Sequence, residues 1–279
     1  MHEALSKQPV ARLTSTARQH RRIASTMACI LVPAWLFAQG AAADNHITAK
    51  PPVTIEASDF LEWNQTAGTY IAKGKAYVVQ GQSNISADHI IANYVPSSKS
   101  RDLTRVVATG AVLYNNGENS ARGDRLDYDL TASSYVLTGQ NARASGPQGT
   151  MTANKSITFD DSDINRQIVT AIGKARYQNS DGRIIHGDRL VAVLDADGAL
   201  INIDAFDNTK VVTEQGTTAT ADQLIYIAST ALAKLNGNVV INDRDNVMRG
   251  ARAEIDFDKD VSRILSDGPG KRVSGLLTP

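Results

Sequence analysis

The sequence predicts an all-β fold built as a stack of antiparallel strand repeats. One motif recurs along the chain, residues within each copy alternate between apolar and polar, and turn-forming residues separate the alternating runs. After position 43, no window of 11 or more residues has helical periodicity. Alternation over about four to eight residues is typical of half-buried antiparallel strands.

The repeated motif is a small residue followed by Asp or a close equivalent, which leads into an alternating strand. The second residues of its copies are 29, 36, 30, 34, 34 and 29 positions apart, a repeat-protein period. Each Asp is expected to accept a hydrogen bond from local backbone. The copies are Ser58-Asp59, Ala87-Asp88, Gly123-Asp124, Ala153-Asn154, Gly187-Asp188, Ala221-Asp222 and Gly250-Ala251.

Within each copy, apolar residues recur at every second position. Leu126, Tyr128 and Leu130 are expected to point one way, and Asp127 and Asp129 the other. This pattern predicts about two short strands per copy. With seven or eight strands per sheet, at about 4.8 Å each, the body would be roughly 35 Å long.

The first 43 residues have the pattern of a cleaved signal peptide. Arg21 and Arg22 precede an apolar stretch at 23–38, and Ala41-Ala42-Ala43 fits the cleavage rule. We therefore expect residues 44–279 to form a single repeat domain that is secreted. The alternative is a retained anchor, although the apolar stretch is short for a span of roughly 20 residues.

Charge and cysteine content narrow the function classes. Residues 1–43 carry five of the 29 basic residues and one of the 29 acidic residues, so the remainder has 24 and 28. This net negative charge argues against nucleic acid as a partner. The single cysteine, Cys29, lies in the leader, and aromatic residues make up only 5% of the chain, which suits a thin, elongated body.

No pattern after the leader predicts catalysis or metal binding. His46, His89 and His186 are far apart, and 268–272 resembles a phosphate loop only superficially, because no Ser or Thr follows Lys271. The spacing of about 30 residues does not match nine-residue calcium-binding repeats. We expect no enzymatic activity, no metal and no cofactor.

Three stretches carry a resemblance to a known family. They are 52–59 (PVTIEASD), 123–130 (GDRLDYDL) with 135–139 (YVLTG), and 267–273 (DGPGKRV). Over roughly residues 52–277 the chain resembles the OstA-like β-jelly-roll domain of Gram-negative lipopolysaccharide-transport proteins, the LptA family. The resemblance is greatest to the soluble periplasmic bridge component of that pathway.

The resemblance implies a twisted, open-ended β-jelly roll whose two sheets enclose an apolar groove for the acyl chains of lipid A. Each buried methylene is worth about 0.8 kcal/mol, so an acyl chain strongly prefers such a groove to water. The expected function is to carry lipopolysaccharide from the inner to the outer membrane. The implied partners are the inner-membrane C component, the outer-membrane D component and further copies in a head-to-tail oligomer.

The implied lipid-binding residues come partly from the resemblance and partly from the phase of the repeat. They are Val53, Ile55, Leu113, Leu126, Tyr128, Leu130, Leu190, Leu194, Leu224, Tyr226, Ile255 and Phe257. Periodicity alone does not distinguish such residues from a closed core. The resemblance also implies that the two end strands pair with partners, through Val53, Thr54, Ile55, Arg272, Val273 and Leu276.

Three other functions remain open at this point. Without leader cleavage, the chain would fit the anchored inner-membrane C component. A polysaccharide-binding or adhesin β-solenoid would need aromatic stripes on the outward positions, which are mostly Asp, Arg, Asn and Ser. An enzyme on a β-helix scaffold would need an acidic cluster in a cleft.

Overall fold

The computed structural model describes residues 51–97, 102–268 and 270–276. Nearly all described residues lie in strands or their turns, as the alternation predicted. The expected leader lies outside the described residues. The strands are β1 (Val53–Glu56), β2 (Phe60–Asn64), β3 (Thr69–Gln80), β4 (Ser83–Tyr94), β5 (Leu103–Asn116), β6 (Asn119–Asp129), β7 (Ser134–Thr138), β8 (Ala142–Gly146), β9 (Gly149–Ala153), β10 (Ser156–Asp163), β11 (Arg166–Gln178), β12 (Ile184–Asp195), β13 (Leu200–Val212), β14 (Thr218–Ile227), β15 (Leu232–Asp243), β16 (Asn246–Asp256), β17 (Val261–Leu265) and β18 (Ser274–Leu276), with the 3₁₀ turn η1 (Ala228–Thr230) between β14 and β15.

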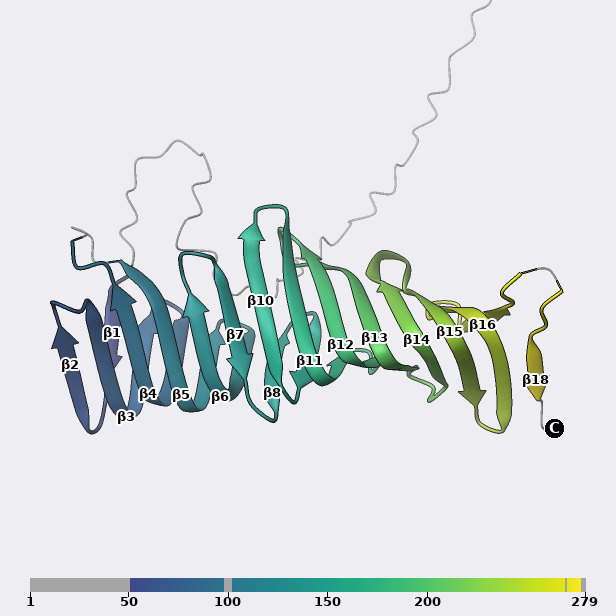
Figure 1. Cartoon of the computed structure of the whole chain (residues 1–279), viewed down its shortest axis with the longest axis horizontal. Coiled ribbons are helices and arrows are strands. Elements are labelled where there is room, and N and C mark those ends of the chain that lie inside the picture. Colours follow the sequence, from purple (N-terminus) through teal and green to yellow (C-terminus); the bar gives the residue numbers. More distant parts are fainter. Residues whose placement is uncertain (1–50, 98–101, 269, 277–279) are drawn as a thin grey trace, which may run out of the picture.

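The strands form an elongated two-layer body, with β2 near one end and β18 at the other (Figure 1). Each long strand contributes one half to each layer. The front sheet has the order β2-β3-β4-β5-β6-β7-β10-β11-β12-β13-β14-β15-β16-β17. The back sheet has the order β1-β3-β4-β5-β6-β8-β9-β11-β12-β13-β14-β15-β16-β18.

The body is longer than the sequence predicted. Fourteen strand segments per sheet give thirteen spacings of about 4.8 Å, or roughly 60 Å instead of 35 Å. The expectation of short strands was wrong for the same reason. Most of these strands run 10 to 14 residues, because they continue through the corner between the sheets.

A residue pair with positive φ marks the corner in five of the long strands, and the strand register shifts at each pair. The extra residue is a β-bulge, which bends the strand. In four of the five strands the pair begins with Gly, so a Gly inside an alternating run marks the corner of the fold. The pairs are Gly74-Lys75, Gly110-Ala111, Gly173-Lys174, Asp207-Asn208 and Gly237-Asn238.

The Asp of the repeated motif packs against the corner of the next strand. Asp222 Oδ2 accepts a hydrogen bond from Asn238 Nδ2 at 2.9 Å, and Asp188 Oδ2 accepts one from Asn208 Nδ2 at 2.7 Å. At both positions the recorded partner is a side chain on the neighbouring strand, not the local backbone expected from the sequence.

Candidate lipid-binding groove

Two rows of side chains, apolar except for Ser262 at one end, line the inner face of the front sheet. Register places one residue of each row on every strand of the front sheet. Large residues often face small ones across neighbouring strands, which lets the rows pack closely. The first row is Leu61, Ala72, Ile90, Ala108, Leu126, Leu137, Ile157, Ala171, Leu190, Ala205, Leu224, Leu235, Ala253 and Ile264. The second is Trp63, Tyr70, Ala92, Val106, Tyr128, Tyr135, Phe159, Val169, Ala192, Ile203, Tyr226, Ala233, Ile255 and Ser262.

A third apolar row faces these two from the back sheet. It begins at Ile55 on β1, reaches Gly275 on β18 and includes Tyr114, Met151 and Tyr177. The buried members of all three rows belong to one hydrophobic cluster. The interior is therefore apolar along the whole described length of the body.

The two sheets meet at the corners and separate along the opposite side, where the hairpin turns lie. We call this opening the seam, the front-sheet ends its front lip and the back-sheet ends its back lip. The front lip presents mainly apolar residues, including Leu103, Leu130, Leu194 and Leu200. The back lip is more polar, with Gln80, Ser83, Asn84, Ser145 and Gln148. A ligand held at the seam would meet hydrocarbon on one side and hydrogen-bonding groups on the other.

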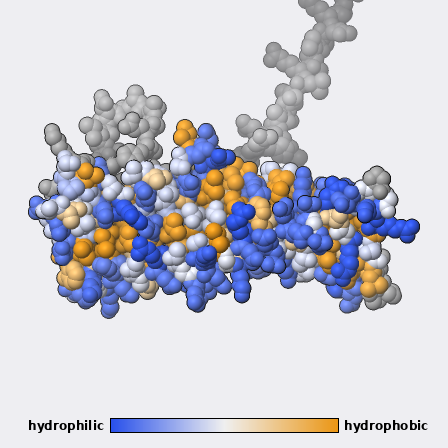
Figure 2. Space-filling view, viewed as in Figure 1, coloured by the Kyte–Doolittle hydropathy of each residue, from blue (hydrophilic) through white to orange (hydrophobic). Residues whose placement is uncertain are grey.

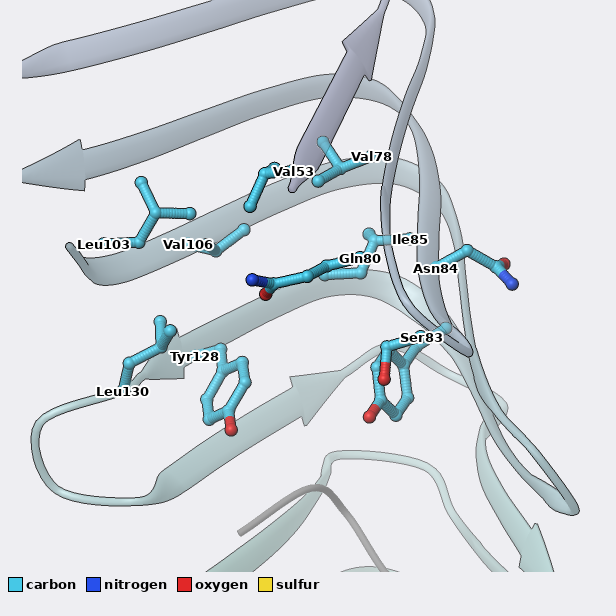
Figure 3. Close-up of a pocket in the computed structure, with 11 residues that line it drawn as sticks. Val53, Val78, Gln80, Ser83, Asn84, Ile85, Leu103, Val106, Tyr128 and Leu130 are labelled. Carbon is cyan, nitrogen blue, oxygen red and sulfur yellow. The ribbon is translucent and has the colours of Figure 1, made fainter. Parts of the chain in front are cut away.

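The first hollow in the seam lies near the β1 end (Figure 3). Val53 and Val78 from the back sheet lie across from Leu103, Tyr128 and Leu130 of the front sheet. About 560 Å³ of space, part of it open to solvent, lies between these side chains. This hollow could hold part of an acyl chain.

The second hollow lies near the middle of the chain and holds about 470 Å³ of space, again partly open to solvent. Its ring-bearing side chains are Tyr135, Phe159 and Tyr177, and the Tyr135 and Phe159 rings stack with centroids 5.3 Å apart. Tyr177 donates its hydroxyl hydrogen bond to the Gln148 carbonyl at 2.5 Å, which fixes the turn at the back lip.

Burial near these hollows favours the neutral forms of several tyrosine hydroxyls and of one carboxyl group. Burial raises the pKa of Tyr128 to about 12, and it also raises the pKa of Tyr114 and Tyr135. Burial raises the pKa of the Asp161 carboxyl as well, because the apolar surroundings disfavour its charged form. Among the described residues, no cluster of His, Cys, Asp and Glu could hold a metal ion.

The structure brings some of the predicted lipid-binding residues together. Val53, Tyr128 and Leu130 line the first hollow, and Leu194 lines the second. Ile55 packs against the core from the back sheet. Tyr226 and Phe257 form an edge-to-face pair with centroids 5.8 Å apart, and the Arg183 guanidinium lies 5.0 Å from the Phe257 ring centroid. Leu194 is itself only 1% exposed, and the residues that are as well covered but line neither hollow are Leu126, Leu190, Leu224 and Ile255.

The orientation expected for Leu113 is wrong. In β5 the side chains of Val112 and Tyr114 point inward, so Leu113 between them points outward and is 41% exposed. Its assignment came from the family resemblance and not from the alternation around it.

Sequence reasoning missed several residues of the hollows. Leu103 and Tyr114 of the first hollow and Met151, Phe159 and Leu200 of the second were not proposed. Their alternation was visible in the sequence. The sequence did not show which residues face each other across the seam, because these residues are far apart in the chain.

Four strands have an unpaired edge at the ends of the described body. They are β1 and β2 at one end and β17 and β18 at the other. Val53, Thr54 and Ile55 lie in β1, and Leu276 lies in β18, as expected. Arg272 and Val273 precede β18 and lie outside any strand, which corrects their expected place. The last strand begins later in the sequence than expected, because turn residues, including Gly270 with φ 80°, come before it.

The outer face of the front sheet is mostly hydrophilic, with apolar residues in scattered groups (Figure 2). Exposed Val136 and Ile225 lie on this face. Arg189 lies over the Phe206 ring at 3.8 Å from its centroid, so part of the apolar surface is covered by cations. The outward aromatic stripes that a carbohydrate-binding solenoid would need do not run along the described part of this sheet.

Comparison with known proteins identifies the relatives of this fold. A family described as LptA/(LptD N-terminal domain) LPS transport protein, where LPS is lipopolysaccharide, matches residues 54–164 and again 160–261. No curated protein matches. A solved structure of LptH, the LptA homologous periplasmic component of the lipopolysaccharide-transport device from Pseudomonas aeruginosa, is 13% identical. The match covers 82% of this chain and 96% of that one, with a TM-score of 0.22.

The two family matches meet at β10, so the chain carries two consecutive copies of the domain. The first copy ends with β9 and β10, and both of these strands pair with β11, the first complete strand of the second copy. Both sheets therefore continue from one copy into the next. Within the described residues, no helix is long and apolar enough to cross a membrane.

Proposed function

Because this chain belongs to the LptA/LptD N-terminal domain family of lipopolysaccharide-transport proteins, we propose that it is the periplasmic bridge that carries lipopolysaccharide from the inner to the outer membrane. The observation that supports this most directly is the apolar inner face, which runs without a break from β2 to β17. A lipid can move along such a surface without leaving an apolar environment. In this proposal the protein acts by binding and not by catalysis, and its first residues direct it to the periplasm.

The lipid-binding residues of this proposal are those that line the seam. Val53, Tyr128, Leu130 and Leu194 come from the sequence prediction, and Leu103 joins them from the structure. The covered members of the predicted set, such as Leu190, contact lipid only if the sheets separate, because they are buried and line neither hollow. While the sheets stay together, these residues belong to the hydrophobic core.

The junction between the two copies supports end-to-end assembly. There β10 pairs with β11 in the front sheet and β9 pairs with β11 in the back sheet, antiparallel in both. Strand directions alternate along the body, so β17 of one molecule could pair with β2 of the next in the same way. The proposed neighbours are the C component at the β1–β2 end, the D component at the β17–β18 end, and further copies of this chain.

Photo-crosslinking in cells tests the proposal. A photoreactive phenylalanine analogue at Tyr128, inside the first hollow, should give an adduct with lipopolysaccharide. The same analogue at Leu113 is the matched control, since Leu113 is apolar and exposed but points outward. Equal adduct yields from Tyr128 and Leu113 would show that the groove does not hold the lipid.

The family description also covers the N-terminal domain of the D component, so that role is the alternative. Fractionation separates the two. A bridge is recovered from the soluble periplasmic fraction, with a chain that starts near Asp44. A D component is recovered with the outer membrane.

A further inference from the structure

The second hollow is built from both copies of the family domain. Tyr135, Ala144 and Ser145 come from the end of the first copy, on β7 and β8. Leu194 and Leu200 come from β12 and β13 of the second copy. The first hollow, by contrast, is lined by first-copy strands and Val53. The second hollow therefore depends on the fusion of two copies in one chain.

Two buried polar atoms at this hollow have no hydrogen-bond partner. Gln148 lines the hollow from the back lip, and its Nε2 is buried without an acceptor. Gln167 on the front lip is 2% exposed, and its Oε1 has no donor. It lies opposite Leu194 in register and two positions before Val169 on the same face of β11, and both of those residues line the hollow.

Unpaired buried amide atoms are rare in folded proteins, because their lost hydration is not replaced. Here a free donor at the back lip lines the hollow, and a free acceptor lies beside two of the lining residues at the front lip. The Gln80 amide in the first hollow differs, since its Nε2 donates to the Pro51 carbonyl at 3.0 Å. Of the two glutamines that line the hollows, Gln148 is therefore the one whose amide nitrogen has no acceptor.

We propose that the second hollow is a lipid site that recognises a polar group carried on an acyl chain, namely an amide linkage. The amide carbonyl accepts a hydrogen bond from Gln148 Nε2, and the amide N–H donates to Gln167 Oε1. The hydrocarbon packs on Phe159, Leu194 and Leu200. This inference rests on the proposed function and adds a preference for N-linked over ester-linked acyl chains, together with a resting point halfway along the seam.

The test compares two probes that differ in one linkage. The full chain is titrated calorimetrically with N-dodecanoyl-glucosamine and with the 2-O-dodecanoyl ester of glucose, which carries the same acyl chain at the same ring position. The wild-type protein should bind the amide about tenfold more tightly, since the ester lacks the N–H donor. Gln167→Met should abolish this preference while leaving ester binding nearly unchanged. Gln148→Met should weaken binding of both probes, because both carry a carbonyl.

Controls separate recognition from folding. Gln80→Met in the first hollow should keep the tenfold preference. Gln167→Met should lower the melting temperature by no more than a few degrees, because it removes the amide's hydrogen bond to Asp161 but also an unpaired buried oxygen. Equal binding of the two probes by the wild-type protein would overturn this inference and leave the proposed function standing. If neither probe bound and Tyr128 also gave no lipopolysaccharide adduct, the proposed function would fail with it.

Discussion

At the scale of single residues, the carboxylate of the repeated Asp lies where a Cβ of the corner Gly would be. At Gly237 φ is 80°, and an added Cβ would lie 2.2 Å from Asp222 Oδ2. At Gly110, where φ is also 80°, an added Cβ would lie 2.2 Å from Asp88 Oδ2. The corner thus needs a residue that tolerates positive φ and leaves room for the carboxylate.

A prediction at this scale follows from the crowding. Gly237→Ala should lower the free energy of unfolding by about 2–4 kcal/mol, because both the backbone and the Asp222 contact are strained. Gly182→Ala is the control. Gly182 has φ 83° but no atom within 4 Å of an added Cβ, so its cost should be about 1 kcal/mol. Urea unfolding of both variants measures the difference, and equal costs would rule out the carboxylate contact.

At the scale of elements, alternation decides which face each side chain occupies. The sequence predicted this phase for Leu126, Tyr128 and Leu190, and the structure places all three on the inner face. It could not show that one long strand serves two sheets. An alternating run has the same pattern whether the strand stays in one layer or bends at a bulge into the next.

The corrected orientation of Leu113 gives a prediction for β5. Leu113→Asp should change the free energy of unfolding by no more than about 0.5 kcal/mol, because the carboxylate stays in water. Val112→Asp should cost more than about 4 kcal/mol, because it buries an unpaired charge. Thermal unfolding followed by circular dichroism checks both variants. A severe loss of stability in Leu113→Asp would restore the inward orientation.

At the scale of the whole molecule, the free ends complement each other. Extending the first inner row from Ile264 to Leu61 of a second molecule sets the register of β17 on β2. That register puts Arg263 opposite Glu62 and Leu265 opposite Phe60. An opposite-charge pair and an apolar pair would thus flank the continued row.

Charge reversal tests this register. Glu62→Arg should weaken self-association at least tenfold, because it places two cations opposite each other. The double variant Glu62→Arg with Arg263→Glu should restore it, since the pair is re-formed with its signs exchanged. Asp197→Arg, in the turn between β12 and β13, is the control and should have no effect. Sedimentation velocity over a concentration series measures all four proteins, and failure of the double variant to recover would exclude this register.

The sequence alone determined the all-β class, the repeat and the inward phase of most apolar residues, because these depend on neighbours in the chain. Tertiary structure decided which inward residues are accessible. Leu130 lines a hollow, whereas Leu190 is sealed in the core, although both have the same alternation. The difference arises because the sheets touch near the corners and separate at the lips. Tertiary structure also decided the second hollow, because its walls come from two copies of the domain that the pairing of β10 with β11 brings together.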